Sequence, residues 1–264
     1  MREVNAATRS PVLRALGWAD VVSALRSGAG DLLRAPLLGL ALGGIIALGG
    51  LISLLSIVSW NAGWIAMMIA VVFPLIFPFI AAGLYETSRR LARGEPRRIG
   101  AIVATMLNQR ERQLGWMAFV VLFIFWVWVY QVRILLALFF GFGASANLGR
   151  FVVTIATTPN GWSFIAVGSA VGLIIALFLF AITLVSMPLL FESDIDFVTA
   201  MILSVGTVTR SAVPLLGFGV LATAATILSI LSGFLGFFVL VPLLGHTAWH
   251  LYQRACIRSG APTS

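Results

Sequence analysis

The chain contains two histidines, His246 and His250, which lie four residues apart near its carboxyl end. In a helix this spacing places both imidazole rings on one face, one turn apart. Two such rings can bind one zinc or copper ion from the same side. They cannot supply both axial ligands of a single haem, because those ligands lie on opposite sides of the iron. Ionisable residues at the edge of a membrane span are candidates for function, so the pair indicates a metal- or proton-handling site.

Four carboxylates, Glu86, Glu192, Asp194 and Asp196, fall on the same predicted side of the membrane as the histidines. The candidate metal-site residues are therefore His246, His250, Asp194, Asp196 and Glu86. A metal site requires these residues to converge, because two imidazoles alone leave the coordination incomplete. A metal ion is thus one option, and the sequence requires no cofactor.

The aromatic residues beside the histidines support a structural alternative. Trp249 and Tyr252 flank His250, and Tyr85 closes an earlier apolar segment with the same Leu-Tyr ending. Tryptophan and tyrosine are enriched at membrane interfaces, where the rings sit among headgroups. On this interpretation Trp249, Tyr252 and Tyr85 anchor helix ends, and His250 joins them.

The carboxylates also have a structural alternative. Asp194 and Asp196 precede an amphipathic segment and could cap its positive end. Glu86 is spaced to pair with Arg89 and Arg90 within one helix. We favour capping and pairing over catalysis, and we assign no catalytic residue.

Composition identifies the solvent in which the chain folds. It is 60% hydrophobic and 10% charged, with a mean hydropathy of +1.06. A soluble domain carries about 25% charged residues, so lipid must cover much of this chain. The apolar stretches are continuous and long, which favours membrane helices over a β-barrel with its short alternating segments. The single cysteine, Cys256, excludes an internal disulfide.

The hydrophobic segments predict an all-α, polytopic bundle of about six transmembrane helices in residues 36–254. A span needs about 20 apolar residues. The charge-free stretch from Ser211 to Gly245 is too long for one span, and Ser232-Gly233 is its natural break. The expected spans are Pro36–Ser59, Trp64–Tyr85, Leu114–Tyr130, Trp162–Leu190, Pro214–Leu231 and Gly233–Tyr252.

The segments outside these spans are short. Residues 1–35 are expected to be a cytoplasmic segment in which Pro11–Arg34 has the pattern of an amphipathic helix lying in the membrane interface. The segment lacks the features of a cleavable signal peptide. Residues 255–264 form a short tail. Residues 134–161 are expected to be the longest external connection, and whether they form a re-entrant segment is left open.

Arginine placement predicts the orientation. All 17 basic residues are arginine, and 15 of them fall in the two termini and the connections that share their side; Arg133 and Arg150 fall opposite. Basic residues accumulate on the cytoplasmic side, so both termini are expected in the cytoplasm. The same arginines would attract anionic lipid headgroups. In so hydrophobic a chain they do not indicate nucleic-acid binding.

Several sequence blocks resemble a known family. These are Gly83-Leu84-Tyr85-Glu86, the stretch VSMPLLFESDIDFVTAMILS from Val185, and GHTAWHLY from Gly245. They are similar to a family of bacterial integral membrane proteins catalogued as domain of unknown function 2189. The resemblance extends from about Pro11 to Arg254 and implies a location in the bacterial inner membrane. It implies no activity.

Three functions remain open at this point. The first is a non-enzymatic accessory or assembly component that binds other membrane proteins or lipids. The second is a transporter of ions or small molecules. The third is a metal- or haem-handling protein that uses His246 and His250. We favour the first, because the spans carry almost no charge and the connections are short.

Overall fold

The computed structural model describes residues 12–60, 62–96, 98–108, 113–141 and 148–256. Over these residues the regular structure is helical, apart from one bridge pair between Leu13 and Cys256. The helices are α1 (Trp18–Arg34), α2 (Pro36–Val58), α3 (Gly63–Arg93), α4 (Ile99–Asn108), α5 (Gln113–Phe140), α6 (Leu148–Thr157), α7 (Pro159–Thr183), α8 (Ser186–Glu192), α9 (Phe197–Arg210), α10 (Ala212–Leu231) and α11 (Phe237–Ala255). The predicted all-helical class is confirmed. Nearly all of the expected tail, 257–264, lies outside the described residues.

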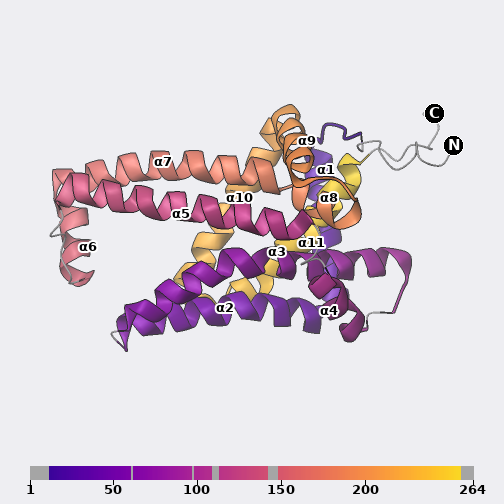
Figure 1. The fold of residues 1–264 in the computed structure, drawn as a ribbon, viewed down its shortest axis with the longest axis horizontal. Coiled ribbons are helices and arrows are strands. Elements are labelled where there is room, and N and C mark those ends of the chain that lie inside the picture. Colours follow the sequence, from indigo (N-terminus) through magenta and orange to yellow (C-terminus); the bar gives the residue numbers. More distant parts are fainter. Residues whose placement is uncertain (1–11, 61, 97, 109–112, 142–147, 257–264) are drawn as a thin grey trace. The chain divides into compact units, whose positions relative to one another are not determined.

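The helices form two compact units, Met1–Ala118 with Ala181–Ser264, and Phe119–Phe180. The second unit contains α6 and the adjoining parts of α5 and α7, which run side by side (Figure 1). Its packing is aromatic. The ring of Phe140 lies edge-on to those of Phe151 and Phe164, with centroids 5.7 and 5.4 Å away. Edge-to-face pairs at such distances stabilise contacts beyond simple burial.

The core of the first unit lies where α2, α3 and α11 pack together (Figure 1). Its buried residues are Leu42, Ile46, Ile80, Leu84 and Val241. The approach of α2 to α11 requires glycine, because a Cβ atom at Gly43 would lie 2.7 Å from the carbonyl oxygen of Phe238. Small residues at such crossings let two membrane helices pack backbone to backbone.

Helix α11 runs antiparallel to α2. Gly39 lies against Pro242, whereas Gly50, farther along α2, lies against Phe234 in the turn before α11. The end of α11 reaches the start of the described chain, where the carbonyl of Ala255 accepts a 2.8 Å hydrogen bond from the backbone N–H of Arg14. Both described ends of the chain therefore lie on one face of the first unit. We call it the basic face, after Arg14 and the arginines at the ends of α1, α3 and α11.

Five segments are long and apolar enough to cross a membrane: Pro36–Val58, Gly63–Arg93, Gln113–Phe140, Pro159–Glu192 and Ala212–Leu231. Helix α11 is not among them, because its second half carries His246, His250 and Arg254. Its antiparallel packing along α2 nevertheless supports a sixth crossing, since two chain ends on one face require an even number. The turn that separates α10 from α11 contains Gly233 with φ 68°, at the break that the sequence predicts.

Two helices extend past their predicted ends. Helix α3 continues beyond Tyr85 to Arg93 and ends where Gly94 adopts a left-handed φ of 67°. Helix α5 continues through Arg133 to Phe140, so residues 134–140 are helical rather than part of a connection. A charged residue marks a membrane boundary, but it does not end a helix. Residues 142–147 of the expected external connection lie outside the described residues.

Helix α1 is amphipathic as predicted, although it begins at Trp18 rather than near Pro11. Its buried residues, Val21, Ala24, Gly28 and Asp31, recur every three or four positions. This stripe packs mainly against α11, with further contacts to α10 and α3. The apolar side of α1 is therefore covered by protein, and an acidic residue lies on that side.

Candidate functional site

Four polar side chains meet where α1, α3 and α11 come together. Asp31 lies on the buried stripe of α1, Ser88 lies near the end of α3, and His246 and His250 lie on successive turns of α11. Ser88 and His246 have no exposed surface, and Asp31 retains 5%. We call these four residues the polar node.

Two short hydrogen bonds connect the three helices of the polar node. Nε2 of His250 lies 2.8 Å from the Asp31 carboxylate, and Nδ1 of His246 lies 2.8 Å from the Ser88 hydroxyl. The first joins α11 to α1, and the second joins α11 to α3. Buried hydrogen bonds of this kind resist separation, because breaking one leaves an unsatisfied polar group in the interior.

Hydrogen bonds in the polar node also affect the charge of Asp31. Burial alone would raise the pKa of the Asp31 carboxyl, but hydrogen bonds from His250 and Ser88 outweigh burial and hold it below its ordinary value. Asp31 is therefore a carboxylate at neutral pH. Nδ1 of His246 and the Ser88 hydroxyl share one hydrogen bond, and which of them donates depends on the tautomer of His246. Nε2 of His246 is buried without a hydrogen-bond partner among the described residues.

A glycine on α1 allows the polar node to form. A Cβ atom at Gly28 would lie 2.6 Å from the Thr247 hydroxyl and 2.8 Å from its backbone nitrogen. Any larger side chain would push α1 away from α11. Asp31, three residues later on the same stripe, would then move away from His250.

The structure does not gather the predicted metal ligands. Over the part of the chain that it describes, no three His, Cys, Asp or Glu side chains form a group that could hold a metal ion. His246 and His250 share a side of α11, as their spacing predicts, but the first bonds to α3 and the second to α1. The other three candidates, Glu86, Asp194 and Asp196, have separate roles.

Glu86 is the fully buried member of an arginine cluster. Its carboxylate forms ion pairs with Arg89 and, at 2.6 Å, with Arg90. The Arg89 guanidinium also lies over the ring of Phe191 on α8, 5.2 Å from its centroid. This confirms the predicted pairing within α3. A buried carboxylate needs such partners, because removing an isolated charge from water is costly.

Two acidic residues, Asp194 and Asp196, lie directly before α9. Asp196 caps α9 by accepting a 2.8 Å hydrogen bond from the backbone N–H of Thr199, and bonding to Thr199 lowers the pKa of its carboxyl. The predicted capping role is thus confirmed for Asp196. Asp194 and Asp196 also line a small surface pocket of about 280 Å³, together with Gln113.

The three expected interfacial anchors are packed inside the first unit. Trp249, Tyr252 and Tyr85 are only 4–5% exposed. The indole N–H of Trp249 donates to Glu192 at 3.2 Å, and the ring of Tyr85 meets that of Phe191 edge-on at 5.9 Å. Helix α8 supplies both partners. Its packing against α3 and α11 cannot be foreseen from the composition of single spans.

Sequence reasoning missed Asp31 and Ser88. The signal for Asp31 was present, because it falls three residues after Gly28 on the stripe that begins at Val21. An acidic residue on the apolar side of an amphipathic helix indicates a buried partner. Ser88 carries no comparable signal, since it is one of many serines at helix ends.

The chain was compared with known families, curated proteins and solved structures. Residues 65–192 match the model of the family described as predicted integral membrane protein (DUF2189). The matched region runs from α3 through α8 and is narrower than the resemblance suggested. It includes Gly83–Glu86 and ends at Glu192, so the GHTAWHLY block lies beyond it. No curated protein and no solved structure matches the chain.

Proposed function

We propose that this chain, which matches the DUF2189 family over residues 65–192, is a non-enzymatic membrane component that associates laterally with another membrane protein. The observation that carries the proposal is an exposed apolar stripe on α5. The most hydrophobic stretch of α5 is only 11% buried, against 33% for α2. In a membrane such an outward apolar face is covered either by lipid or by a helix of another protein.

The stripe has the spacing of a helix-packing seam. Its members are Phe119, Phe123, Val127, Tyr130, Ile134 and Leu138, each 45–73% exposed. They recur every three or four residues, which is the period at which one helix packs against another. From Phe119 to Leu138 the stripe is about 28 Å long at 1.5 Å per residue, close to the thickness of the hydrocarbon core. Its length and spacing fit a transmembrane helix of a partner protein.

Site-specific photo-crosslinking in native membranes tests this proposal. We expect a photoreactive residue at Phe123 or Ile134 to crosslink the same partner protein, in a fixed ratio to the chain. The matched control is Val220 on α10, which is 71% exposed but lies on another helix. Crosslinks to lipid alone, to a second copy of this chain, or equally from Val220 would overturn the proposal.

We also propose that the basic face lies in the cytoplasm of a bacterial inner membrane. The arginine distribution supports this orientation through the positive-inside rule. Arginines at this face would then attract anionic headgroups of the cytoplasmic leaflet. An impermeant thiol reagent provides the test, because Glu95→Cys should react only from the cytoplasmic side and Trp60→Cys only from the other, both in a Cys256→Ser background.

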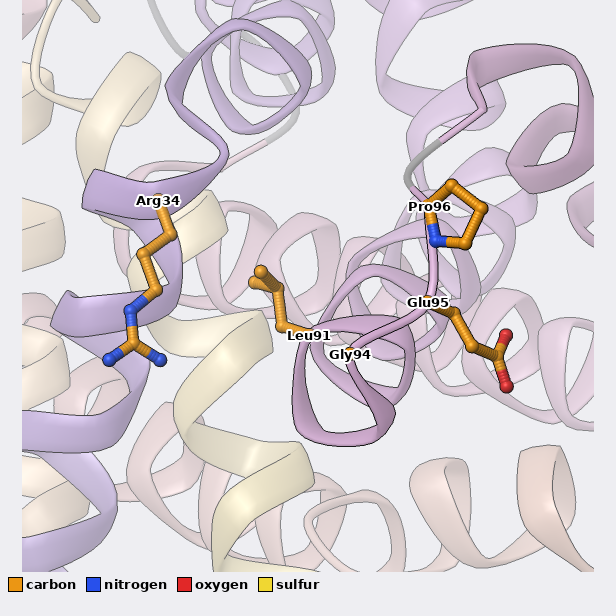
Figure 2. Close-up of a pocket in the computed structure, with 5 residues that line it drawn as sticks. All are labelled: Arg34, Leu91, Gly94, Glu95 and Pro96. Carbon is orange, nitrogen blue, oxygen red and sulfur yellow. The ribbon is translucent and has the colours of Figure 1, made fainter.

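A proton-linked carrier is the second candidate, and the buried Nε2 of His246 favours it. A ring nitrogen without a partner could take a proton during a transport cycle. His246 has no exposed surface, however. It lines neither the pocket beside Asp194 and Asp196 nor the pocket beside Arg34 and Glu95 (Figure 2). Proton flux into proteoliposomes that is lost in His246→Gln would support the carrier, and its absence in the unmodified protein would exclude it.

A further inference from the structure

Helix α4 carries an exposed apolar stripe formed by Ile99, Val103 and Leu107. These residues are 64%, 42% and 56% exposed. They recur every fourth position, which places all three on one side of the helix. Ile102 lies on a neighbouring side and is fully buried. Helix α4 therefore has one apolar side that packs against the protein and a second apolar side, the α4 stripe, that does not.

The depth of α4 relative to the membrane follows from its packing on α3 (Figure 1). Met106 covers Gly83, because a Cβ atom at Gly83 would lie 2.7 Å from its sulfur. Gly63 is the first residue of α3, and at 1.5 Å per residue Gly83 lies about 30 Å farther along the helix. That distance equals the thickness of the hydrocarbon core. Met106 therefore lies where the acyl chains meet the headgroups, on the side of the basic face.

The covalent connection to α5 keeps α4 close to this level. Four residues, 109–112, join Asn108 at the end of α4 to Gln113 at the start of α5. A chain reaches at most about 3.5 Å per residue, so Asn108 stays within about 18 Å of a membrane span. Helix α4 is thus confined to the membrane surface by its packing on α3 and by its connection to α5.

The charges around α4 fit a phospholipid leaflet. The ten residues of α4 carry no charge. The connections on its two sides, residues 94–98 and 109–112, hold four arginines and two glutamates in the sequence. Arg98 is exposed directly before the stripe. In helices that lie in the interface, apolar side chains enter the acyl boundary and arginines reach the phosphates.

We propose that α4 lies in the leaflet at the basic face, with the α4 stripe among the acyl chains and Arg98 among the phosphates. Ala104 and Asn108 are exposed on another side of the helix and face water. The partner of the stripe is therefore a phospholipid surface. This site is independent of the proposed association through α5, because its residues belong to α4 and to the residue directly before it.

Collisional quenching of single fluorescent labels tests this placement. The full chain in a Cys256→Ser background would carry one label at Val103→Cys, Ala104→Cys, Leu107→Cys or Asn108→Cys. It would be reconstituted in nanodiscs of phosphatidylethanolamine and phosphatidylglycerol, which leave both faces open to solutes. We expect nitroxides on the acyl chains to quench the labels at 103 and 107 several times more strongly than those at 104 and 108. Iodide in the water should give the reverse order.

The other outcomes of the quenching experiment overturn the proposal. Equal quenching of all four labels by iodide would place α4 in water, and equal quenching by the nitroxides would place it wholly among the acyl chains. Protection of the labels at 103 and 107 from both quenchers would mean that a second copy of the chain covers the stripe.

Two further variants keep the proposal testable without a label on the substituted residue. Val103→Asp should shift the label at 107 from nitroxide to iodide quenching, because a carboxylate among acyl chains is costly. Ala104→Asp is the matched control, since the neighbouring position faces water and the same charge should leave the label unaffected. Both positions are exposed in the structure, so neither substitution disrupts packing within the protein. Equal effects of the two substitutions would contradict the proposed orientation.

Discussion

The carboxylate of Asp31 on α1 lies 2.8 Å from Nε2 of His250 on α11, and this contact joins residues 219 positions apart. Asp31 belongs to the buried stripe of α1 that packs against α11. The amphipathic amino-terminal helix is therefore held by a specific buried hydrogen bond as well as by apolar contact. Separating α1 from α11 would leave both polar groups without a partner.

Replacing Asp31 with asparagine should destabilise the protein by about 1–2 kcal/mol, because the buried hydrogen bond with His250 loses its charged acceptor. Thermal unfolding in detergent measures the effect. Asp196→Asn is the matched control, since asparagine still caps a helix and its effect should stay within about 0.5 kcal/mol. An Asp31→Asn variant that unfolds at the temperature of the unmodified chain would contradict the role of this contact.

Acidification should weaken the same contact. The folded-state pKa of Asp31 lies below that of a free carboxyl, so its stabilisation is complete above about pH 4. It is then lost as the pH falls through the lowered folded-state value. The difference in melting temperature between the unmodified chain and Asp31→Asn should therefore shrink as the pH falls below about 4. A difference that grows on acidification would show that another group dominates.

Two glycines on α1 provide a test of the helix crossing. Gly28→Ala would place a Cβ atom 2.6 Å from the Thr247 hydroxyl, whereas Gly30 has no neighbouring atom within 4 Å of the corresponding position. We expect Gly28→Ala to cost about 1–3 kcal/mol through overpacking. Gly30→Ala should be neutral or stabilise by about 0.4–1 kcal/mol, because alanine restricts the unfolded chain. Equal effects of the two substitutions on the melting temperature would exclude a close crossing at Gly28.

The sixth crossing can be tested by cysteine labelling. In a Cys256→Ser background, Arg14→Cys and Gln253→Cys should react with an impermeant reagent from the same side of the membrane, because both side chains are accessible. The backbone hydrogen bond from Arg14 N–H to the carbonyl of Ala255 requires this result, because it places both described ends of the chain on one face. Trp60→Cys, in the turn after α2, should react only from the opposite side. Labelling of Arg14→Cys and Gln253→Cys from opposite sides would mean an odd number of crossings.

The spans and the stripe on α1 follow from sequence because they depend on the composition and period of one segment. The partners of His246 and His250 do not. Their spacing places both rings on one side of α11, but the rotation of α1 and α3 decides which polar group meets each ring. Tyr85 and Trp249 illustrate the same limit, because α8 covers them although it is separate from their helices in the sequence. Helix faces can be predicted from a single segment, whereas contacts between helices cannot.

The mass of the assembly extracted from its native membrane is the most direct test of lateral association. The chain would be released in polymer nanodiscs without detergent, and its complexes would be weighed by native mass spectrometry. We expect a species heavier than the 28.3 kDa chain by one partner protein in fixed proportion, and its loss when Phe123 and Ile134 are both replaced by alanine. A single chain carrying only lipid, with or without these substitutions, would contradict the proposed function.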